Sequence, residues 1–148
     1  MNNSKNQLMC GGILCFFFAI FQVVIGFSPS LSLYFGAPES LVKHPGMLII
    51  VSIIIGLMMA LFGLYGFSGA GKIIKLPWRR EILLGIGIIF IARGLLLIPE
   101  VLVVLNLIDS AIPVAARFIY FSIGALLVGG IFIKGTIGQW NSLKQGIE

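Results

Sequence analysis

Arg93 is the residue whose position most strongly suggests chemistry, because it lies inside an apolar stretch that runs from 82 to 108. Arg93 follows Glu81 by 12 positions, so helix rise would carry it roughly 18 Å into a membrane. A charged side chain at that depth is costly and normally faces a partner, a cavity or a ligand. Glu100 shares the same helix face two turns later, and a kink at Pro99 would let the two charges meet.

Three explanations of Arg93 follow from this position. Arg93 could be a structural tie bonded to Glu100 and nearby polar groups, a binding site for an anionic ligand, or a contact for a partner protein's acidic group. If helix rise is counted from the cytoplasmic ends of their segments, other polar side chains reach a similar depth of roughly 18–22 Å. The predicted polar layer around Arg93 and Glu100 therefore includes Gln22, Ser52, Tyr120 and Ser122.

Other motifs offer no catalytic chemistry. The sequence from Gly66 to Lys72 matches part of a phosphate-binding loop, but Ile73 stands where a magnesium-binding Ser or Thr is needed and an apolar segment precedes it. We expect these glycines to end a helix and form a turn. No catalytic residue, metal site or cofactor is predicted, because His44 is the lone histidine and no Cys/His cluster exists. Cys10 and Cys15 point in different directions on a helix, so we expect no disulfide between them.

The elements that position Arg93 follow from composition. The chain has 148 residues, of which 59% are hydrophobic and 10% are charged, whereas a soluble domain is about a quarter charged. A single small domain cannot bury that much apolar surface. The sequence therefore predicts an all-α polytopic membrane protein, because helices satisfy their own backbone groups in lipid.

Four apolar runs are long enough to span a bilayer, which requires roughly 20 residues. The third run contains Pro99, so it either ends there, with 100–108 lying on the membrane surface, or continues as one kinked span. The predicted four-transmembrane-helix bundle is one membrane domain, 1–148, with a basic loop at 68–81. Its spans are 8–27, 47–67, 82–98 (or 82–108) and 114–133.

Orientation follows from the cations that flank the spans. One side of the membrane would carry seven of them and the other side only Lys43 and Arg117. This imbalance places both the N- and C-termini in the cytoplasm, and it explains the net charge of +5 without nucleic acid as a partner. We expect the loop cations to contact anionic membrane lipid. The seven cations are Lys5, Lys72, Lys75, Arg79, Arg80, Lys134 and Lys144, of which Lys72, Lys75, Arg79 and Arg80 form the loop group.

Small residues recur four apart in three of the runs. This spacing lets helix backbones approach closely in lipid, either within one chain or between two copies. The residues are Gly11, Cys15 and Ala19, then Ser52, Gly56 and Ala60, and then Ala125 and Gly129.

The stretch Leu64-Tyr65-Gly66-Phe67-Ser68-Gly69-Ala70-Gly71, followed by Leu76-Pro77 and Arg93-Gly94-Leu95, resembles a group of uncharacterised small four-span proteins of the bacterial inner membrane. The resemblance covers about a third of the chain. It implies a bacterial inner-membrane location and carries over no active site.

The leading hypothesis from the sequence is a non-enzymatic membrane protein that acts through helix packing, as a homo-oligomer or as a small subunit of a larger assembly. The second is a small transporter or lipid-binding protein that holds an anionic or amphipathic ligand at Arg93. A membrane enzyme acting on lipid ranks last, because no acid–base pair or metal site is visible.

Overall fold

The computed structural model describes residues 3–107 and 117–144, and all the regular structure in these segments is helical. Four helices are long and apolar enough to cross a membrane, and short helices connect or follow them. The helices are α1 (Asn3–Gly26), α2 (Pro29–Tyr34), α3 (Glu39–Val42), α4 (Pro45–Gly69), α5 (Arg79–Leu95), α6 (Leu97–Val104), α7 (Arg117–Gly138) and α8 (Trp140–Lys144).

The third apolar run forms two helices, α5 and α6, joined through Leu96. Pro99 explains the break, because its nitrogen cannot donate to the carbonyl of Leu95 and its ring crowds that carbonyl. A helix resumes at once, and Arg79–Val104 together form one candidate span with a break at Leu96. Two predicted span limits fall outside the described residues: the alternative end of the third span at 108, and the start of the fourth span at 114–116.

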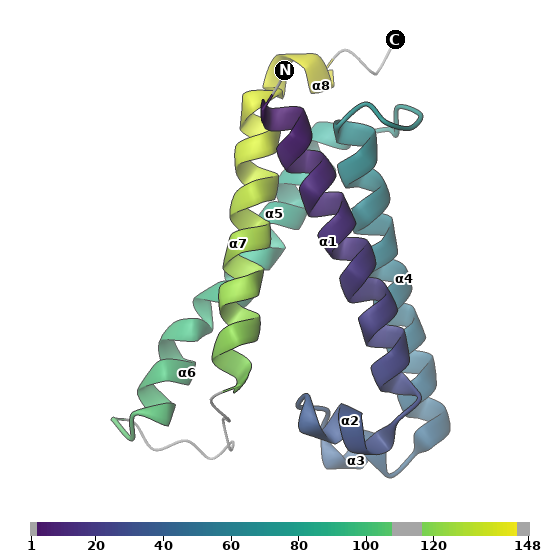
Figure 1. The fold of residues 1–148 in the computed structure, drawn as a ribbon, viewed down its shortest axis with the longest axis vertical. Coiled ribbons are helices and arrows are strands. Elements are labelled where there is room, and N and C mark those ends of the chain that lie inside the picture. The colour runs from purple at the N-terminus through teal and green to yellow at the C-terminus, as the bar shows by residue number, and fades with distance from the viewer. Residues whose placement is uncertain (1–2, 108–116, 145–148) are drawn as a thin grey trace.

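The four long helices form two arms (Figure 1). One arm is α1 packed along α4, and the other is α5 and α6 packed along α7. The arms meet at the end of the molecule that holds both termini, which we name the closed end, and they diverge toward α2, α3 and α6, which we name the open end. The bundle is therefore wedge-shaped, and each arm forms one side of the space inside the wedge.

Small residues bring the helices together within the chain. A Cβ atom added at Gly66 of α4 would lie 2.8 Å from the Cα of Gly12 in α1, and one at Gly129 of α7 would lie 3.0 Å from the carbonyl oxygen of Gly87 in α5. Real Cβ atoms do not approach backbone atoms so closely, so these positions require glycine. Two members of the predicted small-residue stripes take part in contacts within the chain: Gly129 itself, and Gly56 of α4, where an added Cβ would lie 3.2 Å from the carbonyl oxygen of Ala19 in α1.

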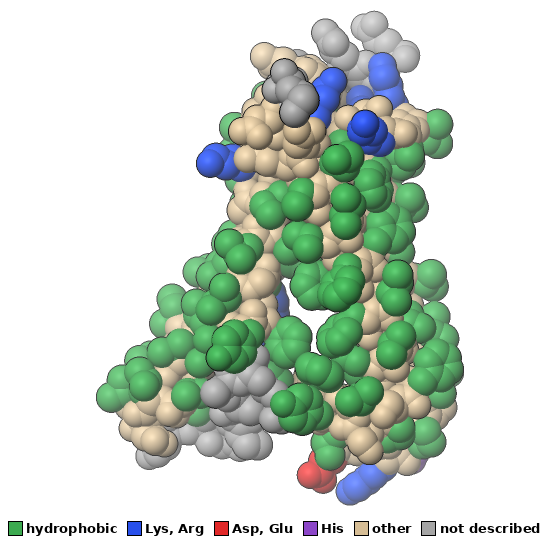
Figure 2. Space-filling model, in the orientation of Figure 1, with side chains coloured by type: hydrophobic (Ala, Val, Ile, Leu, Met, Phe, Trp, Pro, Cys, Tyr) green, Lys and Arg blue, Asp and Glu red, His purple; other side chains and the backbone are tan. Residues whose placement is uncertain are grey.

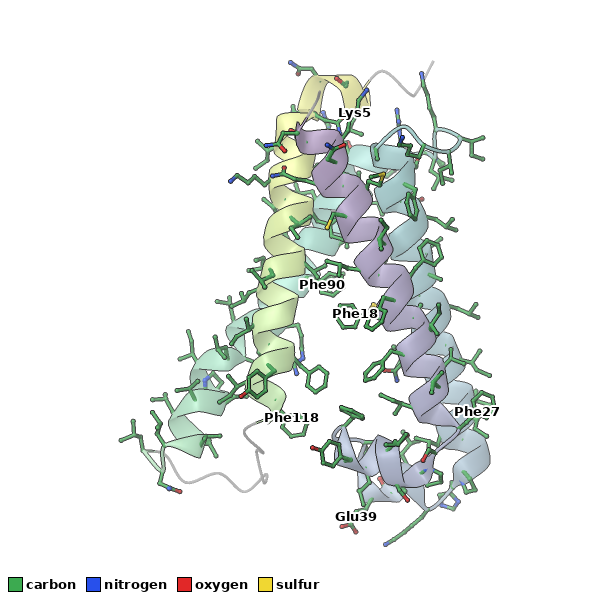
Figure 3. All side chains as sticks on the ribbon, viewed as in Figure 1. Lys5, Phe18, Phe27, Glu39, Phe90 and Phe118 are labelled. Atoms are coloured by element: carbon green, nitrogen blue, oxygen red, sulfur yellow. The ribbon has the colours of Figure 1, made fainter. Side chains whose placement is uncertain are left out.

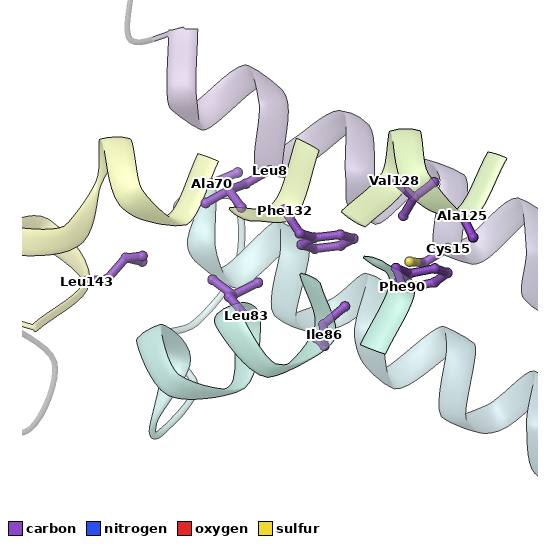
Figure 4. Close-up of a cluster of buried hydrophobic side chains, with 10 residues drawn as sticks. All are labelled: Leu8, Cys15, Ala70, Leu83, Ile86, Phe90, Ala125, Val128, Phe132 and Leu143. Carbon is purple, nitrogen blue, oxygen red and sulfur yellow. The ribbon is translucent and has the colours of Figure 1, made fainter. Parts of the chain in front are cut away.

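The hydrophobic core lies at the closed end (Figure 4). The ring of Phe132 is fully buried and stacks on Phe90, with ring centroids 6.4 Å apart. Leu8, Leu83 and Leu143 bring α1, α5 and α8 to the same cluster. The buried core therefore joins the two arms at the closed end.

Candidate functional site

A cavity of about 710 Å³ lies between the two arms. The space-filling view shows a gap between the arms on the side away from the termini (Figure 2). Its walls are mainly aromatic and aliphatic, and its polar side chains are few. This composition is typical of a ligand pocket, which combines apolar walls with a small number of placed polar groups. Three of the lining residues carry polar or charged side chains: Gln22, Arg93 and Glu100.

Arg93, Glu100 and Ser122 form a hydrogen-bonded cluster in the α5–α7 arm. Arg93 Nη1 donates to Ser122 Oγ at 2.9 Å and lies 3.3 Å from Glu100 Oε1, as a salt bridge. Ser122 in turn donates to Glu100 Oε2 at 2.5 Å. The break at Leu96 makes this contact possible, because a straight helix would hold residues seven apart roughly 10.5 Å from each other along the axis.

The two charges of the cluster differ in exposure. The Arg93 side chain is 42% exposed, whereas that of Glu100 is 13% exposed and Ser122 is fully buried. Within the described part of the chain, both hydrogen bonds of Arg93 come from Nη1. Nε and Nη2 thus remain as donors, and together they form an edge that matches a carboxylate or phosphate.

The structure brings together four of the six residues predicted for the polar layer. Gln22 lines the cavity from α1 and faces the arm that carries Arg93, Glu100 and Ser122. In the described part of the chain its side chain makes no hydrogen bond. A ligand in the cavity would therefore meet polar groups from both arms.

Ser52 and Tyr120 correct the prediction. Ser52 is buried between α4 and α1, where a Cβ on Gly26 would collide with its side chain. Tyr120 is 76% exposed, and it does not line the cavity. Both residues have about the right depth, but their helices are rotated so that they face elsewhere.

Aromatic rings cross the open end from one arm to the other. Phe35, which follows α2, packs edge-on against Phe21 of α1 and Phe121 of α7, with ring centroids 5.2 and 5.6 Å away. Phe18 and Phe90 line the cavity nearer the closed end, and Phe118 lines it nearer the open end (Figure 3). The sequence did not predict this aromatic lining. Its only signal was the count of 12 phenylalanines, which does not indicate where the rings face.

The four cations predicted to contact lipid at the closed end differ in their exposure. Lys72 and Lys75 are exposed, and Lys and Arg side chains gather at this end on the face shown in Figure 2. Arg80 pairs with Glu81 at 2.8 Å and lies over the ring of Trp140. Arg79 is a correction, because it is buried and donates to the Ser68 carbonyl at 3.4 Å instead of facing lipid.

The glycine-rich segment has the structural role that the sequence predicts. Gly69 is the last residue of α4, and Gly71 turns the chain with a φ of +72°. Ser68 Oγ donates to the carbonyl of Ile74 and accepts from the amide of Leu76, both at 2.9 Å. The segment that resembles a phosphate-binding loop is thus tied down by its own hydrogen bonds.

Across residues 3–107 and 118–143, no three His, Cys, Asp or Glu side chains come together as a metal site. Cys10 is exposed and Cys15 is buried, and both are free thiols.

The four apolar helices and their packing define an all-α, multi-pass membrane protein with four spans. No family model matches this chain, and no curated protein or solved structure matches it.

Proposed function

We propose that this protein binds an anionic amphipathic molecule between its two arms, as a lipid-binding protein or small transporter, with Arg93 as the anchor. One observation carries the proposal: a guanidinium at membrane depth lies in a cavity wall with 42% of its side chain exposed. A purely structural tie would favour a fully enclosed arginine, since an open charge is expensive in lipid. The ligand's anionic group would compensate the exposed edge.

The packing of the bundle also favours binding over association between copies. The glycines at the α1–α4 and α5–α7 contacts are used within one chain, so they do not supply an argument for a homo-oligomer. Glu100 keeps the site close to neutral before a ligand binds. The cost of holding Arg93 in the membrane is lowered in this way, and its open edge remains available.

We further propose that the protein belongs to a bacterial inner membrane, with both termini in the cytoplasm. The excess of cations at the closed end supports this orientation. The cavity, which lies toward the open end, would then face the outer half of the bilayer. A ligand would reach Arg93 from the membrane and not from the cytoplasm.

Co-purified lipid tests the proposal. We would extract the protein in a neutral detergent and identify bound molecules by native mass spectrometry, comparing wild type with the double variant Arg93→Gln, Glu100→Gln. The double variant removes both charges together, so neither is left unpaired. Anionic amphiphiles should remain on the wild type and be reduced at least tenfold in the variant.

Arg80→Gln is the matched control, because it removes an arginine outside the cavity. It should retain the same bound molecules as the wild type. Equal occupancy in all three proteins would contradict the proposed function.

A further inference from the structure

The size of the cavity limits the ligand. The volume of about 710 Å³ lies within the roughly 300–1,000 Å³ of pockets that hold one small molecule. A single acyl chain of about 16 to 18 carbons with a small head group is a ligand of that class, whereas a phospholipid with two such chains has about twice as many atoms. The cavity therefore fits a single-chain amphiphile.

The position of the polar groups limits the head group. Arg93, Glu100 and Gln22 are the polar side chains of the lining, and rings such as Phe18, Phe90 and Phe121 make much of the rest. An acyl chain gains close packing against these walls, while among the described lining residues the charged partners for a polar head are Arg93 and Glu100. The site is built for one small head and one long apolar chain.

Electrostatics separates two possible anionic heads. Glu100 already occupies Nη1 of Arg93 at 3.3 Å, so the charges of the pair cancel. A phosphate monoester carries about −1.5 to −2 and would be repelled by Glu100 more strongly than a carboxylate, which carries one negative charge. A carboxylate also matches the remaining Nε–Nη2 edge of the guanidinium, because it is planar and can accept both hydrogen bonds.

We infer that the ligand is a long-chain carboxylate with a single acyl chain, taken from the lipid phase and held by the Nε–Nη2 edge of Arg93. This inference rests on the proposed function, and it names the substrate class of the same cavity. Gln22 lines the same cavity from the opposite arm and carries a further hydrogen-bond donor.

A competition assay with the unmodified protein tests the inference. Radiolabelled palmitate is bound to the protein in neutral detergent, and four unlabelled competitors are compared: palmitate, methyl palmitate, palmitoyl lysophosphatidate and dipalmitoyl phosphatidylglycerol. We expect palmitate to compete best. The methyl ester should be at least tenfold weaker because it lacks the charge, and the lysophosphatidate and the two-chain lipid should each be several-fold weaker.

Arginine variants add a geometric test. Arg93→Lys keeps the charge but loses the planar edge, so it should weaken palmitate binding about tenfold. Arg80→Lys is the matched control and should leave the affinity unchanged, because Arg80 lies outside the cavity lining. Since the competitor series uses the wild-type chain, a folding defect in a variant cannot produce its pattern.

The outcomes separate this inference from the proposed function. If lysophosphatidate or the two-chain lipid competes as well as palmitate and binding still requires Arg93, the single-chain carboxylate is overturned and the proposed function stands. If the methyl ester competes equally and the double variant Arg93→Gln, Glu100→Gln binds palmitate normally, both are overturned.

Discussion

The closed and open ends of the bundle both bring helices together, but they differ in the size of the side chains at the helix interfaces. At the closed end, glycines such as Gly12 and Gly66 bring the backbones of one arm into contact, and the ring of Phe132 packs between the arms, against Gly11 of α1. At the open end, rings such as Phe121 and Phe35 hold the arms apart around a cavity. In lipid, helices associate through packing and polar contacts and not through water exclusion. The size of the interface side chains therefore decides which end is closely packed and which end encloses a cavity.

The largest loss of stability should come from a bulky residue at the α1–α4 contact of the closed end. Gly66→Leu would drive a side chain into the backbone of Gly12, so we expect a loss of about 3 kcal/mol in unfolding free energy. Gly130→Leu is the matched control, because a Cβ there meets nothing within 4 Å. Thermal unfolding in detergent, followed by circular dichroism, measures both. Equal losses in the two variants would mean that the pairing of α1 with α4 does not depend on close backbone contact.

Deleting an aromatic ring at each end should show a smaller difference in unfolding free energy between the two ends. Phe132→Ala removes a fully buried ring that stacks on Phe90, and we expect a cost of about 2 kcal/mol, mainly from the cavity left behind. Phe121→Ala removes a half-buried ring that already borders a cavity and loses its contact with Phe35, so we expect a smaller cost of about 1 kcal/mol. The same unfolding assay checks this order. A larger loss for Phe121→Ala would place the closer packing at the open end.

The sequence predicted how far along its helix each polar residue lies, but it did not predict which way the side chain faces. Counting helix rise places Arg93 and Ser122 at one level, and the chemistry of Pro99 allows Glu100 to join them, as the structure shows. Ser52 has a similar height and faces α1 instead. A helix that is apolar on every side carries little signal about which face turns inward.

The same limit applies to the fold. Runs of apolar residues predict four spans, because a bilayer sets their length. The pairing of α1 with α4, and of α5 with α7, depends on which glycines meet which backbones. Arg79 was misplaced for a related reason: its cationic side chain is typical of the membrane surface, but a carbonyl acceptor at Ser68 lets it lie buried.

A third prediction concerns ligand affinity at the open end. Glu100→Gln removes the carboxylate that lies beside Arg93, so it no longer repels the negative charge of a ligand on the Nε–Nη2 edge. We expect palmitate to bind about tenfold more tightly, which corresponds to about 1.4 kcal/mol. The matched control is Glu81→Gln, because Glu81 pairs with Arg80 outside the cavity. An unchanged affinity in Glu100→Gln would mean that the carboxylate and the ligand do not share one site.

The smallest effect compares two glycines with positive φ, one at each end. Gly71 at the closed end has a φ of +72° with nothing within 4 Å of an added Cβ, so Gly71→Ala should cost only backbone strain of about 1 kcal/mol. Gly36 at the open end has a φ of +95°, and its added Cβ would lie 2.7 Å from the ring of Phe118. That ring lines the cavity, so we expect it to turn inward and Gly36→Ala to cost no more than Gly71→Ala.

The displaced ring would nevertheless occupy ligand space. Gly36→Ala should therefore weaken palmitate binding several-fold while matching the stability of Gly71→Ala, and Gly71→Ala should bind palmitate normally. Unfolding and binding measured on the same samples check both parts. A stability loss in Gly36→Ala as large as that of Gly66→Leu would show that the open end is packed as tightly as the closed end. The open end could then not adjust its packing to a ligand, and a ligand could enter only if the two arms separated at the closed end.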